Sequence, residues 1–378
     1  MLKSIISSAL VLALLSGVVQ SEDYDEIKTP MKAAWLKEVD LSSVPNIPIR
    51  PVGSGECADP KCDGTDNDLC FESCGNQASE DDIYGCPLDH HWALTFDDGP
   101  SNFTNHLLDI LDQAQVKATF CVMGSHVSQY PEVIKRAYEA GHQIASHTFS
   151  HPHLMSLSNE EIIYEVKATE EAIEEAIGVR PRYIRPPYGE ADDRVKALLK
   201  SMGYKVLLWN VDPTDYDVYQ RKDASEVIQG SFKMAAAGED TGLNSHDDLG
   251  FISLQHDLYK ESIDQVPKII QTLQKQGFKL VTAAECNQDQ DPHHLLNAAS
   301  VDKSSAMSEM PPLNLEIPTP PAVGATAVVM SSSSSLAAKT TQVQIKKMTE
   351  TNAALSLSTQ SSSIVALAIS FIYFTLFA

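Results

Sequence analysis

Basic residues are scarce in this sequence: 28 Lys and Arg stand against 51 Asp and Glu in 378 residues, a formal net charge of −23. A surface of that sign repels the phosphate backbone of nucleic acids, so we expect no nucleic-acid partner. It would tolerate or attract a cationic polymer. Acidity that serves solubility alone is the alternative interpretation, and it needs no partner.

Long apolar runs are also missing. Two apolar segments, 5–19 and 364–378, are each shorter than the ~20 residues that span a membrane as a helix. Lys3, the first apolar run and the small-residue pattern that ends at Ser21 predict a secretory signal over residues 1–21. A membrane anchor is the alternative.

The second apolar run follows a polar stretch, 355–363, which itself follows the small residues Asn352-Ala353-Ala354. This order is typical of the signal for a glycosylphosphatidylinositol (GPI) anchor. We therefore expect a lipid at Asn352 and removal of residues 353–378. A tail anchor is the alternative.

Two catalytic signatures are absent: there is no Gly-x-Ser-x-Gly elbow for a serine nucleophile and no Gly-rich phosphate loop. The seven cysteines include no Cys-x-x-Cys pair of the zinc-ribbon type. In a secreted chain they predict disulfides instead, with one thiol left over because seven is odd. The pairing cannot be predicted from the sequence.

Composition divides the rest of the chain into three parts. Residues 22–87 are rich in Pro, Asp and Cys and predict a wrapped extension. Residues 88–290 predict the main domain. Residues 291–352 are rich in Ser, Thr, Ala and Pro, which cannot bury a core and predict an extended stalk. The sequon Asn102-Phe103-Thr104 makes Asn102 a candidate N-glycosylation site.

Strand and helix patterns alternate through the main domain. Ser158 and Glu161 form a capping box at the start of the strongest helical pattern. Repeated strand–helix–strand units imply parallel strands, in a closed barrel or in an open doubly wound sheet. The periodicity predicts seven strands, over residues 92–96, 118–122, 143–146, 183–184, 205–211, 251–254 and 279–282.

Five polar clusters follow predicted strands. Each cluster alone is a weak signal, since Asp, Gly and Pro favour turns and a histidine pair is common on surfaces. The carboxyl ends of parallel strands share one rim, where active sites of such folds lie, so five clusters together predict a site. The clusters are Asp97-Asp98-Gly99, His147 to His151, Arg185 to Gly189, Asp212 with Asp215, and His256-Asp257.

The residue types in these clusters suit metal-assisted hydrolysis. His147 and His151, four residues apart, can bind a metal together with one carboxylate. Such a set suits Zn²⁺, although cobalt, nickel or iron is also compatible. Asp97 and Asp98 are adjacent and point in different directions, so one can bind the metal while the other acts as base on water. A protonated histidine can donate to the leaving nitrogen, which predicts hydrolysis of an amide or ester.

In order, the five clusters resemble the five motifs of the polysaccharide deacetylases (carbohydrate esterase family four, the NodB-homology domain). The resemblance covers residues 88–290, and the extension, stalk and anchor signal are similar to those of fungal cell-wall chitin deacetylases. It implies an α/β fold, a distorted (β/α) barrel of about seven to eight parallel strands. It also implies metal-dependent N-deacetylation of chitin to chitosan and acetate.

The resemblance also implies catalytic roles. Asp97 is the expected general base and His256 the general acid, with Arg185 orienting the base and Asp212 tuning His256. The expected metal ligands are Asp98, His147 and His151, for Zn²⁺ or, as alternatives, Co²⁺ or another divalent metal.

Three further residues are expected around the substrate. The backbone N–H of Tyr188 helps to stabilise the oxyanion. Leu254 lines the pocket for the acetyl methyl group. Tyr216 stands where the family usually has Trp, and we expect it to keep an aromatic wall with altered sugar contacts. Trp209 is interpreted as a core residue instead.

The expected partners are chitin or another N-acetylglucosamine polymer and, through the lipid anchor, the plasma membrane or cell-wall glucan. The protein is expected to be a secreted monomer. Two alternatives remain at this point: a deacetylase or esterase of xylan or peptidoglycan, and a non-catalytic wall protein that binds polysaccharide.

Overall fold

The structure is a computed structural model, and it describes residues 27–54, 82–239, 241–243 and 247–295. The predicted secretory signal, the stalk beyond residue 295, the anchor site at Asn352 and the four cysteines between residues 57 and 74 lie outside the described residues. Within the described residues, no helix is both long enough and apolar enough to cross a membrane.

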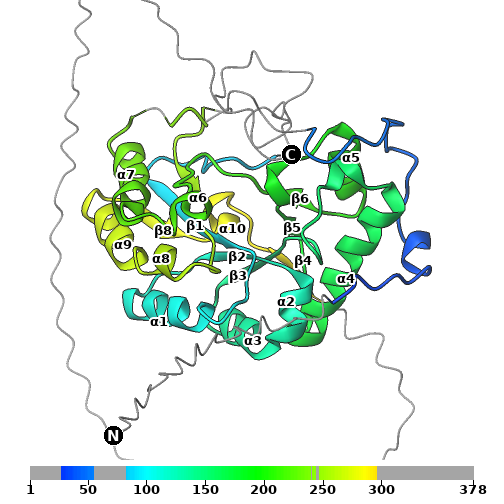
Figure 1. Cartoon of the computed structure of the whole chain (residues 1–378), viewed down its shortest axis with the longest axis horizontal. Helices are drawn as coiled ribbons and strands as arrows, with labels where there is room; N and C mark the ends of the chain where they lie inside the picture. Colours follow the sequence, from blue (N-terminus) through cyan, green and yellow to red (C-terminus); the bar gives the residue numbers. More distant parts are fainter. Residues whose placement is uncertain (1–26, 55–81, 240, 244–246, 296–378) are drawn as a thin grey trace, which may run out of the picture. The chain divides into compact units, whose positions relative to one another are not determined.

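A seven-stranded parallel sheet forms the centre of the fold (Figure 1). The strand order is β6-β5-β3-β2-β1-β7, and β8 pairs with β1 beside β2. Residues 91–93 of β1 pair with β8, and residues 95–97 of the same strand pair with β2. The strands are β1 His91–Asp97, β2 Thr119–Val122, β3 Gln143–Ser146, β5 Tyr183–Ile184, β6 Lys205–Val206, β7 Phe251–Ser253 and β8 Lys279–Val281.

The segment after β6 joins the two ends of this strand order. Val211 forms a parallel bridge with Ser253 of β7, and its carbonyl accepts a 2.9 Å hydrogen bond from the N–H of Leu254. The parallel half-barrel therefore curves back on itself, which confirms the α/β fold and a distorted (β/α) barrel. The predicted strand 205–211 is a regular strand only over β6, which pairs with β5. After β6 the chain moves away from β5, and Val211 pairs with β7 instead.

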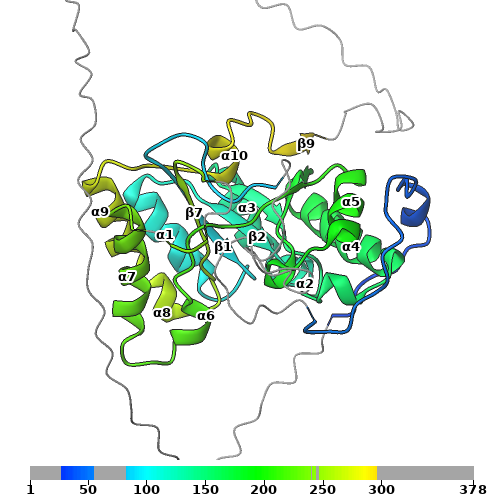
Figure 2. The same ribbon diagram turned by 90° about the horizontal axis from the view of Figure 1, so that it is seen from above.

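The longer helices surround the strands, with α7 and α9 on one side and α4 and α5 on the other (Figures 1 and 2). The helices are α1 Thr104–Ala114, α2 Gly124–Gln129, α3 Pro131–Glu139, α4 Asn159–Ile177, α5 Asp193–Ser201, α6 Asp215–Val218, α7 Ala224–Ala236, α8 Lys260–Ile263, α9 Val266–Lys275 and α10 Ala283–Cys286. The predicted capping box is confirmed: Ser158 Oγ accepts from the Glu161 N–H, and the Glu161 carboxylate accepts from the Ser158 N–H.

The side chains of β1 point alternately to the two faces of the barrel wall. Trp92, Leu94 and Phe96 are fully buried in an apolar cluster shared with α1, α7 and α9. The intervening positions face the opposite side, as period-two geometry requires. That face carries Thr95 and ends in Asp97, so the strand itself delivers a carboxylate to the inside of the rim.

The packed domain extends past both of its predicted bounds. Ile83 forms a parallel bridge with Leu207, so packing begins before residue 88. Beyond residue 290, β9 (His293–Leu295) pairs antiparallel with β4 (Val179–Pro181). Residues 29–38 lie along α4, where Trp35 is buried and Lys32 pairs with Glu171, and Arg50 reaches Asp192 at the start of α5 (Figures 1 and 2).

One disulfide closes most of the domain into a single loop. Cys86 bonds to Cys286 across 200 residues, and Cys121 is a free, buried thiol. In the chain-entropy account, a loop of this length stabilises the folded state by about 5 kcal/mol. Cys86 thus belongs to the barrel rather than to the cysteine cluster that precedes it.

Candidate active site

The five polar clusters meet around one cavity of about 360 Å³ at the carboxyl ends of the strands. Arg185 lies directly behind this catalytic cavity and is fully buried, whereas Asn102 lies outside its lining. Nine of the predicted residues line the cavity: Asp97, Asp98, His147, His151, Tyr188, Asp212, Tyr216, Leu254 and His256.

Asp98, His147 and His151 present three ligand atoms to one point. Asp98 Oδ1 lies 3.3 Å from His147 Nε2 and 3.4 Å from His151 Nε2. The three atoms lie within 4.8 Å of one another, and among the described residues this is the one such group found. The left-handed backbone at Asp98 (φ 72°) and His151 (φ 60°) turns both side chains toward this point.

The surroundings of these three atoms fit a divalent cation. His147 Nδ1 lies 2.7 Å from the carbonyl of Arg185, so Nδ1 donates and Nε2 keeps its lone pair toward Asp98. Asp98 Oδ1 is buried and accepts no hydrogen bond. When His147 is neutral, two nitrogen acceptors and one carboxylate oxygen converge on one point, which is the ligand set that Zn²⁺ and similar ions prefer.

Burial and the neighbouring charges shift the pKa values of Asp98 and His151. Burial raises the pKa of Asp98, but the imidazoles of His147, His256 and His151 outweigh that effect and lower it well below its usual value. Burial and the neighbouring His147 lower the pKa of His151 to about 4, so its ring is neutral and able to bind a metal at neutral pH.

Asp97 is held by the buried Arg185 guanidinium. Arg185 Nη1 donates to Asp97 Oδ1 at 2.7 Å and to Thr95 Oγ1 at 2.7 Å, while Nη2 donates to the Leu208 carbonyl at 2.9 Å. Asp97 Oδ2 lies 3.8 Å from His147 Nε2, on the metal side. One oxygen is therefore fixed, and the other faces the cavity where a water molecule would react.

His256 lines the cavity together with Asp97, and its ring is oriented by Asp215. His256 Nδ1 lies 2.7 Å from Asp215 Oδ1, and the His256 N–H donates to Asp215 Oδ2 at 2.8 Å. Burial lowers the pKa of His256, but the Asp215 carboxylate outweighs burial and raises it to about 10. Asp98 and Asp97 add to this rise, so a cation bound beside them lowers the pKa again.

Asp215, rather than Asp212, hydrogen-bonds to His256, whose charge Asp212 still feels. Asp212 accepts from the Thr214 N–H at 2.7 Å and from the Tyr216 hydroxyl at 3.2 Å. Its burial raises its pKa to about 6. The turn at Thr214 (φ 52°) starts α6 and directs the fully buried Asp215 inward, which the spacing of the two aspartates does not reveal.

The remaining walls of the cavity are aromatic or apolar. Tyr188 is 45% exposed in a left-handed turn (φ 61°), and its ring stacks on His153 at 3.8 Å between centroids. The ring of Tyr216 meets His256 edge-on at 5.4 Å. Trp209 is buried, as expected of a core residue, yet it also lines the cavity. Tyr259 lines it too, although no motif in the sequence marks this residue.

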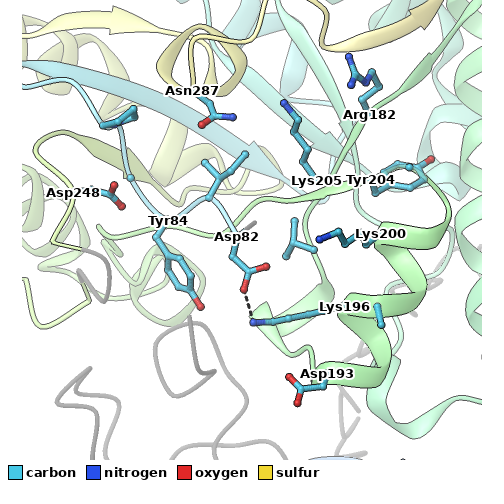
Figure 3. Close-up of a pocket in the computed structure, with 16 residues that line it drawn as sticks. Asp82, Tyr84, Arg182, Asp193, Lys196, Lys200, Tyr204, Lys205, Asp248 and Asn287 are labelled. Carbon is cyan, nitrogen blue, oxygen red and sulfur yellow. Dashed lines mark hydrogen bonds and ion pairs between the residues drawn. The ribbon is translucent and has the colours of Figure 1, made fainter. Parts of the chain in front are cut away.

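A larger cavity of about 600 Å³ lies away from the catalytic cavity (Figure 3). Its walls include Arg182 and Lys205, which stand at the amino ends of β5 and β6. Asp82 pairs there with Lys196 of α5. The active sites of parallel barrels lie at the opposite, carboxyl rim, so size does not identify the site here.

The chain is similar to known deacetylases of polysaccharides. Residues 84–207 match the family model described as polysaccharide deacetylase. The chain is 36% identical over 268 residues to chitin deacetylase 1 of Cryptococcus neoformans var. grubii, which is 67% of this chain and 54% of that relative. The chain thus spans about half the length of that relative.

A chitin deacetylase from Colletotrichum lindemuthianum matches over most of its own length. It is 35% identical over 200 residues, which is 51% of this chain and 78% of the relative. The structure of the chitin deacetylase from that fungus matches with a TM-score of 0.52 at 32% identity, over 58% of this chain and 97% of the other.

Proposed function

This chain belongs to the polysaccharide deacetylase family, and from that premise we propose that it hydrolyses the N-acetyl groups of chitin to give chitosan and acetate. The observation that carries the proposal is the catalytic cavity: a metal-ligand triad of Asp98, His147 and His151, with Asp97 and His256 beside it. A base, an acid and an electrophile site on one rim are what amide hydrolysis requires.

The chain's own residues divide the proton transfers. Asp97 takes a proton from the attacking water, and Arg185 holds the carboxylate so that only one oxygen is available. His256 donates a proton to the leaving nitrogen, oriented by Asp215. A divalent cation, when bound, polarises the acetyl carbonyl and acidifies the attacking water.

We expect the acetyl group to bind beside these residues. Leu254 is buried at the cavity wall and offers an apolar contact for the methyl group. The proposed donor to the developing oxyanion is the backbone N–H of Tyr188, and the left-handed turn at this residue supports that role. Tyr216 supplies an aromatic wall for the sugar ring.

Replacing Asp215 by Asn should move the alkaline limb of the kcat/KM profile about 2 pH units toward lower pH. His256 acts in its protonated form, so activity falls as the pH rises through its pKa, and removing the Asp215 charge lowers that pKa. The measurement is acetate release against pH. Asp217→Asn, on the exposed side of α6, is the matched control and should leave the limb in place. An unmoved limb in Asp215→Asn would assign Asp215 a purely structural role.

Chitin is proposed as the substrate over other wall polymers because of the similarity to named chitin deacetylases. The test is acetate release from a panel of acetylated chito-oligomers, acetylated xylan and peptidoglycan, using purified protein with added zinc. The proposal expects chito-oligomers to be the best substrates. A clear preference for xylan or peptidoglycan would overturn chitin as the proposed substrate and leave the proposed hydrolytic mechanism unchanged.

We propose in addition that the protein is a secreted monomer held at the plasma membrane or wall glucan by a GPI lipid at Asn352, with a glycan on Asn102. The sequence order of small residues, polar spacer and apolar run supports the anchor. Release from intact cells by a phosphatidylinositol-specific phospholipase tests the membrane-bound form.

A further inference from the structure

The two histidines of the metal-ligand triad lie in one loop, residues 147–151, which follows β3 and is called the triad loop below. Its backbone is unusual, because Thr148 and His151 have positive φ angles of 66° and 60°. Residues with a side chain rarely adopt this left-handed conformation, least of all a β-branched residue such as Thr. It persists only where the surrounding structure holds it. The contacts of the triad loop therefore decide where His151 lies.

Glu165 of α4 supplies several of these contacts. Its Oε2 accepts hydrogen bonds from the backbone N–H groups of Phe149 and Ser150, each at 2.9 Å. Its Oε1 accepts a hydrogen bond from the Ser150 hydroxyl, also at 2.9 Å. Phe149 and Ser150 are the two residues between the left-handed positions. One carboxylate thus ties the strained part of the triad loop to a long helix.

Glu165 acts on the loop and not on the substrate. The residue is only 6% exposed and lies outside the lining of the catalytic cavity. A buried carboxylate is costly unless hydrogen bonds satisfy it, and the donors to Glu165 come largely from the triad loop. Without the carboxylate, the two backbone N–H groups would lose their acceptor inside the protein, and the loop would relax.

The two histidine ligands are held in different ways. His147 directly follows β3, and its ring is oriented by the bond between Nδ1 and the Arg185 carbonyl at 2.7 Å. His151 lies at the far end of the triad loop, and its N–H donates to Thr148 Oγ1 of the same loop at 3.2 Å. The position of His151 therefore depends on the conformation of the loop, which Glu165 holds.

Glu165 is itself held by the N-terminal strap, defined as residues 29–38, which lies along α4 (Figures 1 and 2). The hydroxyl of Thr29 donates to Glu165 Oε1. Further along the strap, Lys32 pairs with Glu171, and the Trp35 ring packs against Tyr164 with 6.4 Å between centroids. The strap thus reaches the triad loop through a single side chain of α4.

We propose that Glu165 is a positioning residue for the metal site. It fixes the triad loop so that His151 meets Asp98 and His147, and Thr29 of the strap keeps the carboxylate in place. This inference rests on the proposed function and extends its metal site to a helix and to a segment that precedes the barrel. Hydrogen-bond partners that orient metal ligands typically contribute about 10–100-fold to metal affinity.

The test is the Zn²⁺ affinity of the purified protein, measured by competition with a colorimetric chelator, which needs no turnover. Glu165→Ala should weaken Zn²⁺ binding about tenfold. Glu165→Gln should restore most of the affinity, because its amide oxygen can accept both backbone N–H groups and its NH₂ can donate to the hydroxyls. Thr29→Val removes one bond to the carboxylate and should cause a smaller loss, about threefold.

Glu170→Ala is the matched control on the same helix. Glu170 is 7% exposed and accepts from the Tyr204 hydroxyl and from Lys167, each at 2.9 Å, rather than from the triad loop. Glu170→Ala and Glu165→Ala should both lower the Tm, and only Glu165→Ala should weaken Zn²⁺ binding. Equal weakening in the two variants, or unchanged affinity in Glu165→Ala, would overturn the positioning role.

If Glu165→Ala does not fold, Thr29→Val and Lys32→Ala decide the question. Lys32→Ala breaks the strap's exposed pair with Glu171 and should keep wild-type Zn²⁺ affinity. Equal affinities in these two variants would overturn the positioning role. Zn²⁺ affinity that depends on Glu165, without acetate release from any substrate, would refute the proposed catalysis and keep the positioning role. Normal acetate release with Zn²⁺ affinity independent of Glu165 would refute the positioning role alone.

Discussion

Replacing Asp97 by Asn should lower the kcat of acetate release by about a thousandfold and leave the bound metal in place. Asn keeps the shape of Asp and can still accept the 2.7 Å hydrogen bond from Arg185, but it cannot take a proton from water. We expect the metal to stay because its proposed ligands, Asp98, His147 and His151, are unchanged. Acetate release and metal content, measured on the same preparation, check both halves of the prediction.

The control for this variant must address stability, because a neutral amide in place of Asp97 leaves the buried charge of Arg185 without its partner. Breaking a buried ion pair on one side costs about 3–5 kcal/mol. Asp82→Asn removes one partner of another buried pair, with Lys196 in the cavity of Figure 3, away from the catalytic rim. Both variants should unfold more easily, and only Asp97→Asn should lose kcat. Retention of more than a tenth of the wild-type kcat would refute Asp97 as the base.

Replacing His151 by Ala should weaken metal affinity by at least about 100-fold, because removing even a residue that only hydrogen-bonds to a metal ligand costs about 10–100-fold. His151 is the more exposed of the two histidine ligands, with 22% of its side chain accessible against 3% for His147. The fold should therefore survive its removal. Metal retained after dialysis against a weak chelator gives the affinity change, and excess zinc should restore part of the activity.

His153→Ala is the matched control, since this histidine lies two residues away and outside the triad. Its ring stacks on Tyr188 and its Nδ1 lies 2.9 Å from Glu190 Oε2. It should keep the metal and lose at most part of its substrate affinity. Equal metal loss in both variants would contradict the assignment of Asp98, His147 and His151 as the ligand set.

Much of the site could be predicted because its residues follow strands in the chain. Asp97, His147 and Arg185 each stand at or just after the end of a predicted strand, and parallel strands bring those ends to one rim. The capping box at Ser158 is likewise a local feature, and the structure confirms it.

Features that depend on distant residues could not be predicted in this way. Asp215 hydrogen-bonds to His256 because of a left-handed turn at Thr214, which no residue pattern marks. The Cys86–Cys286 bond and the closure of the barrel at Val211 join segments far apart in the chain. Helix α2 is only six residues long, too short for an apolar period to appear.

The central claim is that one divalent cation, held by Asp98, His147 and His151, is required for removal of acetyl groups from an N-acetylglucosamine polymer. The most direct test is acetate release from chitotetramer by the same protein before chelation, after chelation and after return of one equivalent of zinc. We predict loss on chelation and recovery at one equivalent. Acetate release that is unaffected by complete removal of the metal would contradict the claim. So would the absence of acetate release from folded, zinc-loaded protein.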